Sequence, residues 1–221
     1  MFSDDFNLTC VPKYYGDDLH NDRSYLMLEY LDSTIQDYIH LEPFNGKLSL
    51  RDIALQSFNC LWEIHKVYHL HRDVKPDNFM ISMKDNKVKI IDFGLVIDYM
   101  PNGRDGAHRP LGKYSFQGTA RYGSINTLMG YNSGRRDDLE GLGYSIMALI
   151  DEKLMPWNDI PGNKTKEIAA SKLNFLQCDA KELPPEFVGI RDFIRECYQT
   201  QYEAEPNYMR LESLLRDAFS L

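Results

Sequence analysis

The sequence lacks the features that would suit it to a membrane or to nucleic acid. Its longest nearly apolar stretch, residues 141–150, is too short to cross a bilayer. The 25 Lys and Arg residues are outnumbered by 33 Asp and Glu residues, which leaves a formal net charge of -8. The cationic surplus that binds nucleic acid or an anionic membrane is therefore missing, and we expect neither as a partner.

The sequence also has few cysteines and no signal-peptide pattern at its start. None of the four cysteines belongs to a Cys-x-x-Cys pair, and the first residues are Met-Phe-Ser-Asp-Asp rather than a basic stretch followed by an apolar one. This pattern predicts a reduced intracellular protein, cytoplasmic or nuclear. The apolar fraction of 43% and charged fraction of 26% are ordinary for a globular protein, so we expect one folded domain over residues 1–221.

Strand patterns dominate the first part of the chain. Residues 11–15 and 25–28, separated by a polar loop over residues 17–22, predict a hairpin. Two further strands are expected at 79–82 and 88–91, joined by a turn.

Helical patterns occupy most of the remainder. A short helix is expected after Asp32-Ser33, and Ser49-Leu50-Arg51-Asp52 resembles a capping box that opens a longer helix ending near His69. Later helical patterns cover residues 138–150 and begin again at 164, 187 and 209. Strands followed by helices predict an α+β fold.

The densest cluster of chemically useful residues is His71-Arg72-Asp73-Val74-Lys75-Pro76-Asp77-Asn78, followed by Asp92-Phe93-Gly94. An antiparallel hairpin over residues 79–91 would place Asn78 beside Asp92 at its open end. An amide oxygen and a carboxylate there would suit Mg²⁺ carrying the phosphates of a nucleotide such as ATP.

Asp73 and Lys75 supply the remaining groups for phosphoryl transfer. Asp73 would accept the proton of an attacking hydroxyl, and Lys75 would place a positive charge at the transferred group. Phosphoryl transfer needs positioned charges rather than a covalent nucleophile. The residues therefore predict an enzyme that transfers phosphate from ATP.

The segment from His71 to Asn78 and the segment Asp92-Phe93-Gly94 match the protein kinase signature, and their pairing at this spacing is specific. Three further segments resemble the casein kinase 1 family: Gly118-Thr119-Ala120-Arg121-Tyr122, Ser124-Ile125-Asn126 and Arg135-Arg136-Asp137-Asp138-Leu139-Glu140. Leu183-Pro184-Pro185-Glu186-Phe187 is similar to the related tau-tubulin kinases. The resemblance implies a serine/threonine kinase fold with residues 1–28 as a remnant of the small lobe, 29–33 as the hinge and 34–221 as the large helical lobe.

The resemblance also implies roles for individual residues. The backbone from Glu29 to Leu31 would hold adenine, with Leu28 as gatekeeper and Met80 and Ile91 lining the adenine site. Asp138 would anchor the catalytic loop, and Gly118, Thr119 and Arg121 would shape the loop on the substrate side. An anion pocket for acidic or previously phosphorylated protein substrates would use Arg121, Arg135, Arg136 and Lys172, although a solvated basic face explains these four residues equally well.

Two other features carry weaker expectations. The segment 101–118 occupies the activation-segment position and contains Arg104, His108, Arg109 and Lys113, which would face an acidic substrate. His65 and His69 lie four residues apart, but without an acidic or Cys partner in register they are expected to pack or to lie at the surface rather than to bind zinc.

Three elements of a complete kinase are missing from the sequence. It has no Gly-rich loop, no credible strand Lys and no helix Glu to pair with it. Three interpretations stay open: a fragment or mis-started product of an active kinase, a chain whose small lobe is completed by a partner chain, or a catalytically impaired pseudokinase that serves as an interaction module.

Overall fold

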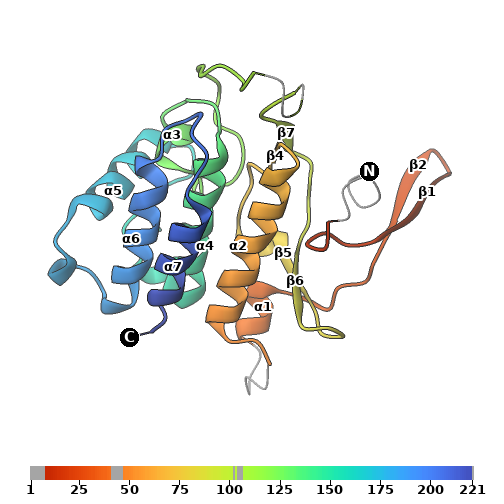
Figure 1. Cartoon of the computed structure of the whole chain (residues 1–221), viewed down its shortest axis with the longest axis horizontal. Coiled ribbons are helices and arrows are strands. Elements are labelled where there is room, and N and C mark those ends of the chain that lie inside the picture. The colour runs from red at the N-terminus through yellow and green to blue at the C-terminus, as the bar shows by residue number, and fades with distance from the viewer. Residues whose placement is uncertain (1–7, 41–46, 102, 104–106, 221) are drawn as a thin grey trace.

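The computed structural model describes residues 8–40, 47–101, 103 and 107–220. A mostly helical body carries a two-stranded hairpin that projects from one side (Figure 1). The strands are β1 (Tyr14–His20), β2 (Arg23–Leu28), β3 (Ser33–Thr34), β4 (His69–Leu70), β5 (Phe79–Ser82), β6 (Lys87–Ile90) and β7 (Ile97–Asp98). The helices are α1 (Ile35–His40), α2 (Leu50–Lys66), α3 (Ile125–Leu128), α4 (Arg135–Asp151), α5 (Thr165–Gln177), α6 (Pro185–Gln199) and α7 (Tyr208–Asp217), with 3₁₀ turns η1 (Pro76–Asn78), η3 (Glu152–Leu154) and η4 (Ala180–Glu182). The predicted α+β fold is confirmed.

The projecting hairpin differs from its prediction in where it turns. β1 pairs antiparallel with β2 as far as His20 and Arg23, so the turn is confined to Asn21 and Asp22, whose φ values are 49° and 58°. The predicted polar loop over 17–22 is therefore wrong. Asp17 and Asp18 belong to a strand that is exposed on both faces, where a polar side chain is solvated and does not interrupt pairing.

The second sheet lies inside the body and has the order β3-β5-β6. Phe79 lies opposite Ile90, which confirms the expected antiparallel pairing with strand bounds within one residue of the prediction. The Ile90 amide donates to the Cys10 carbonyl at 2.8 Å, which joins the N-terminal segment to this sheet.

Helix α2 begins at the predicted capping box. The Asp52 amide donates to the Ser49 hydroxyl oxygen at 3.1 Å, and the Ser49 amide donates to the Asp52 carboxylate at 2.9 Å. The helix ends at Lys66, earlier than the predicted end near His69, because Tyr68 takes a φ of 67° and turns the chain into β4.

The main core lies between α2, α4, α6 and α7, which pack side by side in Figure 1. Phe58 on α2 contacts the rings of Phe193 on α6 and Tyr208 on α7, each at a centroid distance of 6.2 Å. Helix α4 is buried along most of its length, and a Cβ at its Gly143 would lie 2.2 Å from Ile194 Cγ1. This close approach fixes α4 against α6. No helix among the described residues is long and apolar enough to span a membrane.

Candidate active site

The buried carboxylate of Asp138, in the first turn of α4, holds the turn that precedes Asp73. Asp138 accepts hydrogen bonds from the backbone amides of His71 at 2.7 Å and Arg72 at 2.8 Å, and its Oδ2 lies 3.1 Å from His65 Nε2. Burial alone would raise the pKa of Asp138, but His65 and the backbone donor lower it, so the carboxylate stays ionised. Arg72 takes a φ of 70°, and these bonds hold that uncommon conformation.

Asp73 lies at the centre of a set of donors. Its Oδ2 is 2.8 Å from Lys75 Nζ, and its Oδ1 accepts hydrogen bonds from both the amide and the hydroxyl of Thr119 at 3.0 Å. Burial raises the pKa of Asp73, but the Lys75 ammonium and the Thr119 donors outweigh it and lower the pKa overall. Asp73 is therefore an oriented carboxylate at neutral pH.

Asn78 connects Asp73 to the strands that follow. Its side-chain Nδ2 donates to the Asp73 carbonyl at 2.8 Å and lies 3.2 Å from Asp73 Oδ2. The Asn78 carbonyl accepts from the Ile91 amide at 2.9 Å, so the ends of β5 and β6 lie together and Asp92 follows directly. Asp73 and then the nearby carboxylates of Asp77 and Asp92 raise the pKa of Lys75, and together they outweigh the opposite effect of burial.

The residues at this end of the sheet fit a magnesium ion by the chemistry of their donors. Asp92 is exposed, with a φ of 62°, and the Asn78 amide nitrogen is already engaged with Asp73. The oxygens of the Asp92 carboxylate and of the Asn78 amide are hard ligands of the kind that Mg²⁺ prefers. The structure thus brings Asp73, Lys75 and Asn78 into direct contact, and Asp92 follows the residue whose amide binds the Asn78 carbonyl.

The expected hinge runs from the hairpin to β5. The Asp32 amide donates to the Ile81 carbonyl at 2.9 Å, which places this segment beside the strand that carries Met80. Among the described residues, neither the Glu29 carbonyl nor the Leu31 amide has a hydrogen-bond partner. The His71 ring bonds the Ile91 carbonyl at 2.9 Å and so ties Ile91 to the catalytic loop.

The side chain of Glu29 has a structural contact that the sequence did not reveal. Its Oε2 lies 2.5 Å from Lys89 Nζ on β6 and accepts from the Lys13 amide at 3.0 Å. Burial raises the pKa of Glu29, but the bonds from Lys89 and Lys13 outweigh it and lower the pKa. The ion pair fixes the base of the hairpin to the body.

On the substrate side, Thr119 and Arg121 border a cavity of about 360 Å³ that also has Asp77 and Trp157 in its wall. The Arg121 guanidinium pairs with Glu152 at 2.8 Å, and its backbone carbonyl accepts from Trp157 Nε1 at 3.0 Å. A Cβ at Gly118, whose φ is 100°, would lie 2.8 Å from the Arg72 carbonyl. The loop that contains Gly118 therefore passes close against the turn that contains Arg72 and Asp73.

The predicted anion pocket is wrong for Lys172. Lys172 is fully buried, and its ammonium donates to the Gly123 carbonyl at 2.5 Å and lies 3.9 Å from the centre of the Tyr144 ring. Burial lowers the pKa of this ammonium well below its ordinary value. The aromatic ring and the carbonyl replace the water that would otherwise solvate this ammonium. Lys172 is therefore an internal support for the segment that contains Gly123.

Arg135 and Arg136 also make internal contacts. Arg135 lies over the Tyr99 ring at 4.7 Å and donates to the Glu203 carbonyl, while Arg136 donates to the Thr200 carbonyl at 2.6 Å. Of the four predicted anion-binding residues, Arg121 alone borders the substrate-side cavity described above.

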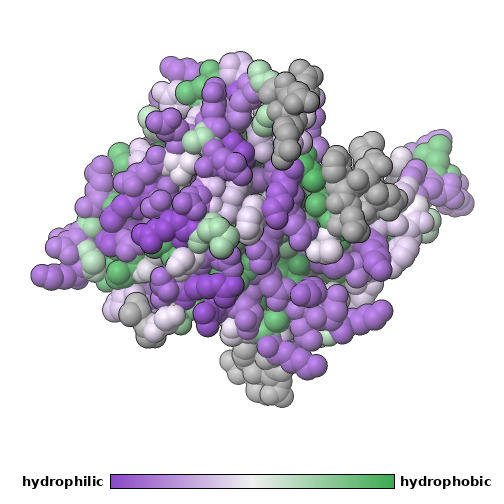
Figure 2. Space-filling model, viewed as in Figure 1, coloured by the Kyte–Doolittle hydropathy of each residue, from purple (hydrophilic) through white to green (hydrophobic). Residues whose placement is uncertain are grey.

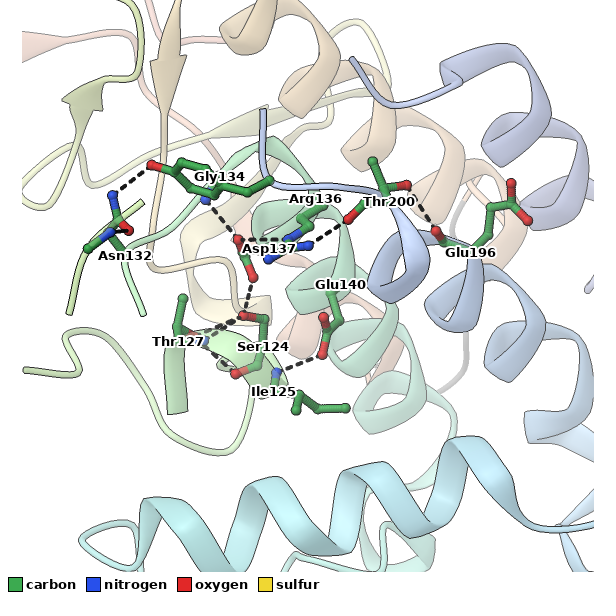
Figure 3. A network of polar contacts seen from close by, with 12 residues as sticks. Ser124, Ile125, Thr127, Asn132, Gly134, Arg136, Asp137, Glu140, Glu196 and Thr200 are labelled. Atoms are coloured by element: carbon green, nitrogen blue, oxygen red, sulfur yellow. Dashed lines mark hydrogen bonds and ion pairs between the residues drawn. The ribbon is translucent and has the colours of Figure 1, made fainter. Parts of the chain in front are cut away.

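Figure 3 shows a polar network between the start of α3 and the first turns of α4 that the sequence did not predict. The Ser124 hydroxyl donates to buried Asp137 at 2.5 Å, and the Ile125 amide donates to Glu140 at 2.8 Å. Burial and then the nearby Asp137 raise the pKa of Glu140 to about 7. The signal available in the sequence was a run of acidic residues opening an otherwise apolar helix, since buried acids need partners.

Other predicted residues have simple placements. His65 packs inside the body with Nδ1 2.8 Å from the Tyr208 hydroxyl, as expected of a packed histidine. The Arg109 guanidinium donates to the Asp98 carbonyl, Lys113 is exposed, and His108 packs against Tyr202. Arg104 lies outside the described residues.

Comparison with known proteins agrees with this geometry. The protein kinase domain model matches residues 6–212. A protein of Dictyostelium discoideum described as a probable serine/threonine-protein kinase is 34% identical over 209 residues, which cover 91% of this chain and 40% of that protein. The chain thus spans less than half the length of this relative, and it belongs to the protein kinase family.

Proposed function

We propose that this chain is a serine/threonine protein kinase that transfers the γ-phosphate of ATP to protein hydroxyls. The observation that carries the proposal is the environment of Asp73, whose two carboxylate oxygens are held by Lys75 and Thr119 beside Asn78. Such a carboxylate is oriented and ionised, as a base for an incoming hydroxyl must be.

In the proposed reaction, the substrate hydroxyl oxygen forms a bond to the γ-phosphorus while the bond from that phosphorus to the bridging oxygen breaks and ADP leaves. Asp73 takes the hydroxyl proton, and Lys75 stabilises negative charge on the transferred group. Bound Mg²⁺ would supply neutralisation of the phosphate charge, held by Asn78 and Asp92. The Glu29 carbonyl and the Leu31 amide would bind the adenine edge.

The test is incubation of the purified chain with labelled ATP, Mg²⁺ and an acidic protein substrate. Asp73→Asn is expected to lower incorporation by about 10² to 10⁴, the usual contribution of a positioned general base. Asp217→Asn makes the same chemical change at an exposed position of α7 and should leave incorporation unchanged. Equal incorporation by the chain and its Asp73 variant would refute the assignment of the base.

The finer proposal is a casein kinase 1-like preference for acidic or previously phosphorylated proteins. Arg121 supports it, because its partly exposed guanidinium lies at the substrate-side cavity. Arg121→Gln is expected to lower kcat/KM for an acidic peptide by about fivefold, the effect of one exposed ion pair, and to leave a neutral peptide unaffected. An equal loss with both peptides would argue against substrate recognition by Arg121.

A non-catalytic interaction protein is the second candidate, favoured by the missing Gly-rich loop and strand Lys. Each missing donor at a developing charge lowers a rate by about 10² to 10³. Transfer is therefore expected to be slow unless a partner chain or a longer product supplies those strands. A thermal-shift titration with Mg-ATP separates the candidates, since a ligand of the native state raises Tm. A rise in Tm together with measurable phosphate transfer supports the kinase. A rise in Tm without phosphate transfer supports the interaction protein.

A further inference from the structure

Glu140, in the second turn of α4, is a carboxyl group buried inside the helical body. The face of the body in Figure 2 is largely hydrophilic, with many polar side chains in water, whereas Glu140 is fully buried. Its Oε1 accepts hydrogen bonds from the Ile125 amide and the Tyr144 hydroxyl, each at 2.8 Å, and its Oε2 has no donor among the described residues. A buried carboxylate that lacks a donor is costly, so the protonated form is favoured.

The groups around Glu140 offset its negative charge only in part. On its own helix, Tyr144 donates a hydrogen bond, but buried Asp137 lies one turn earlier and repels a second negative charge. On α6, burial and then Glu140 raise the pKa of Cys197 well above its ordinary value, so this thiol stays neutral. On α5, Lys172 attracts the carboxylate, but it forms its hydrogen bond with a backbone carbonyl. Burial and then Asp137 prevail, and they raise the pKa of Glu140 to about 7.

The segment 118–125 connects Glu140 to the proposed base. The amide and the hydroxyl of Thr119, near the start of this segment, both donate to Asp73 at 3.0 Å. Ile125, its last residue, donates its amide to Glu140 (Figure 3). A displacement at Ile125 can therefore reach Asp73 through the backbone of one short segment.

We propose that Glu140 is a positioning residue that holds the segment 118–125 in place while it carries a proton and loosens this segment when it ionises. The role concerns the site described above, and its bearing on catalysis rests on the proposed function. Opening of the segment would admit water to Glu140 and return its pKa towards the ordinary value of 4.5. Closing therefore takes up a proton, so the closed form is most stable below about pH 4.5 and loses this stability as the pH rises to about 7.

Amide hydrogen exchange of residues 118–125, measured by mass spectrometry, tests the proposal. Comparison of the wild type with Glu140→Gln at the same pH cancels the intrinsic effect of pH on exchange. From pH 6 to pH 8, the exchange rate of the wild-type segment relative to that of the variant should rise about tenfold, because the closed form loses its proton in this interval while the open form is ionised throughout. Glu167→Gln makes the same change at an exposed position of α5 and should follow the wild type at both pH values.

A rate ratio that stays constant from pH 6 to pH 8 would overturn the proposal, since a purely structural contact acts equally at both. Carbon-13 NMR of the Glu140 carboxyl in the wild-type chain is a second test that needs no variant. Titration near pH 7 is expected, and titration near 4.5 would overturn the proposal. Neither readout depends on phosphoryl transfer, so a chain that passes both tests but transfers no phosphate would refute the proposed kinase activity alone.

Discussion

Single residues around Asp73 include some whose only contacts are internal and which hold the surrounding turns in place. The Asp138 carboxylate belongs to the second group, since it binds two consecutive backbone amides and His65 while fully buried. Lys172 likewise holds a neighbouring segment, because its buried ammonium binds the Gly123 carbonyl. Loss of a holding residue is expected to reduce stability as well as activity.

Asp138→Asn tests this at the catalytic loop. An amide in place of the carboxylate turns one acceptor into a donor that faces a backbone N–H, so we expect the free energy of unfolding to fall by about 3 kcal/mol. Chemical denaturation monitored by circular dichroism measures it. Glu167→Gln removes one partner of an exposed pair with Lys164 and should cost less than about 1 kcal/mol. Equal costs would mean that Asp138 does not hold the loop.

His65 gives the chain a pH dependence that follows from its burial. Burial lowers the pKa of His65 below its ordinary value, so as pH falls the unfolded chain binds a proton that the folded chain does not. The free energy of unfolding should therefore decrease as pH drops through about 6.5. Asp138, whose pKa is also lowered, adds a further loss below its ordinary value near 4.

Denaturant unfolding over a pH series measures this effect. His65→Gln should flatten the decrease between about pH 7 and pH 5, whereas His20→Gln, at an exposed position on β1, should leave it as it is in the wild type. A slope unchanged by His65→Gln would assign the effect to another group.

At the level of elements, the sequence predicted best the parts whose chemistry is local. The capping box of Ser49 and Asp52 and the strands at Phe79–Ser82 and Lys87–Ile90 lie where expected, because caps and alternating apolar residues act within a few positions. Lys172 could not be placed in this way. Its charge suggested solvent, and only the fold brings the Tyr144 ring and the Gly123 carbonyl to it.

The contact between α4 and α6 offers a test of packing at this scale. Gly143→Ala would place a methyl group 2.2 Å from Ile194 Cγ1, and the crowding should exceed the gain in helix propensity. We expect Tm to fall and the free energy of unfolding to decrease by about 1 to 3 kcal/mol. Gly162→Ala, whose nearest neighbour would lie 3.9 Å away, should change stability by less than about 0.5 kcal/mol. A neutral Gly143→Ala would show that the helices can separate without cost.

For the whole molecule, stability is concentrated in the helices and not in the hairpin. Hydrogen exchange should show strong protection in buried α4 and weak protection in β1 and β2. The same protection in both regions would contradict a hairpin that opens independently. The sequence shows no Gly-rich loop, but it could not show that β1 and β2 would be exposed on both faces.

The ion pair between Glu29 and Lys89 has a consequence for the motion of the hairpin. Because Lys89 is buried on β6 and pairs with Glu29 directly after β2, the ion pair restricts how the hairpin can swing relative to the sheet of β3, β5 and β6. Loss of this ion pair should let the hairpin move more freely and should leave the helical body folded.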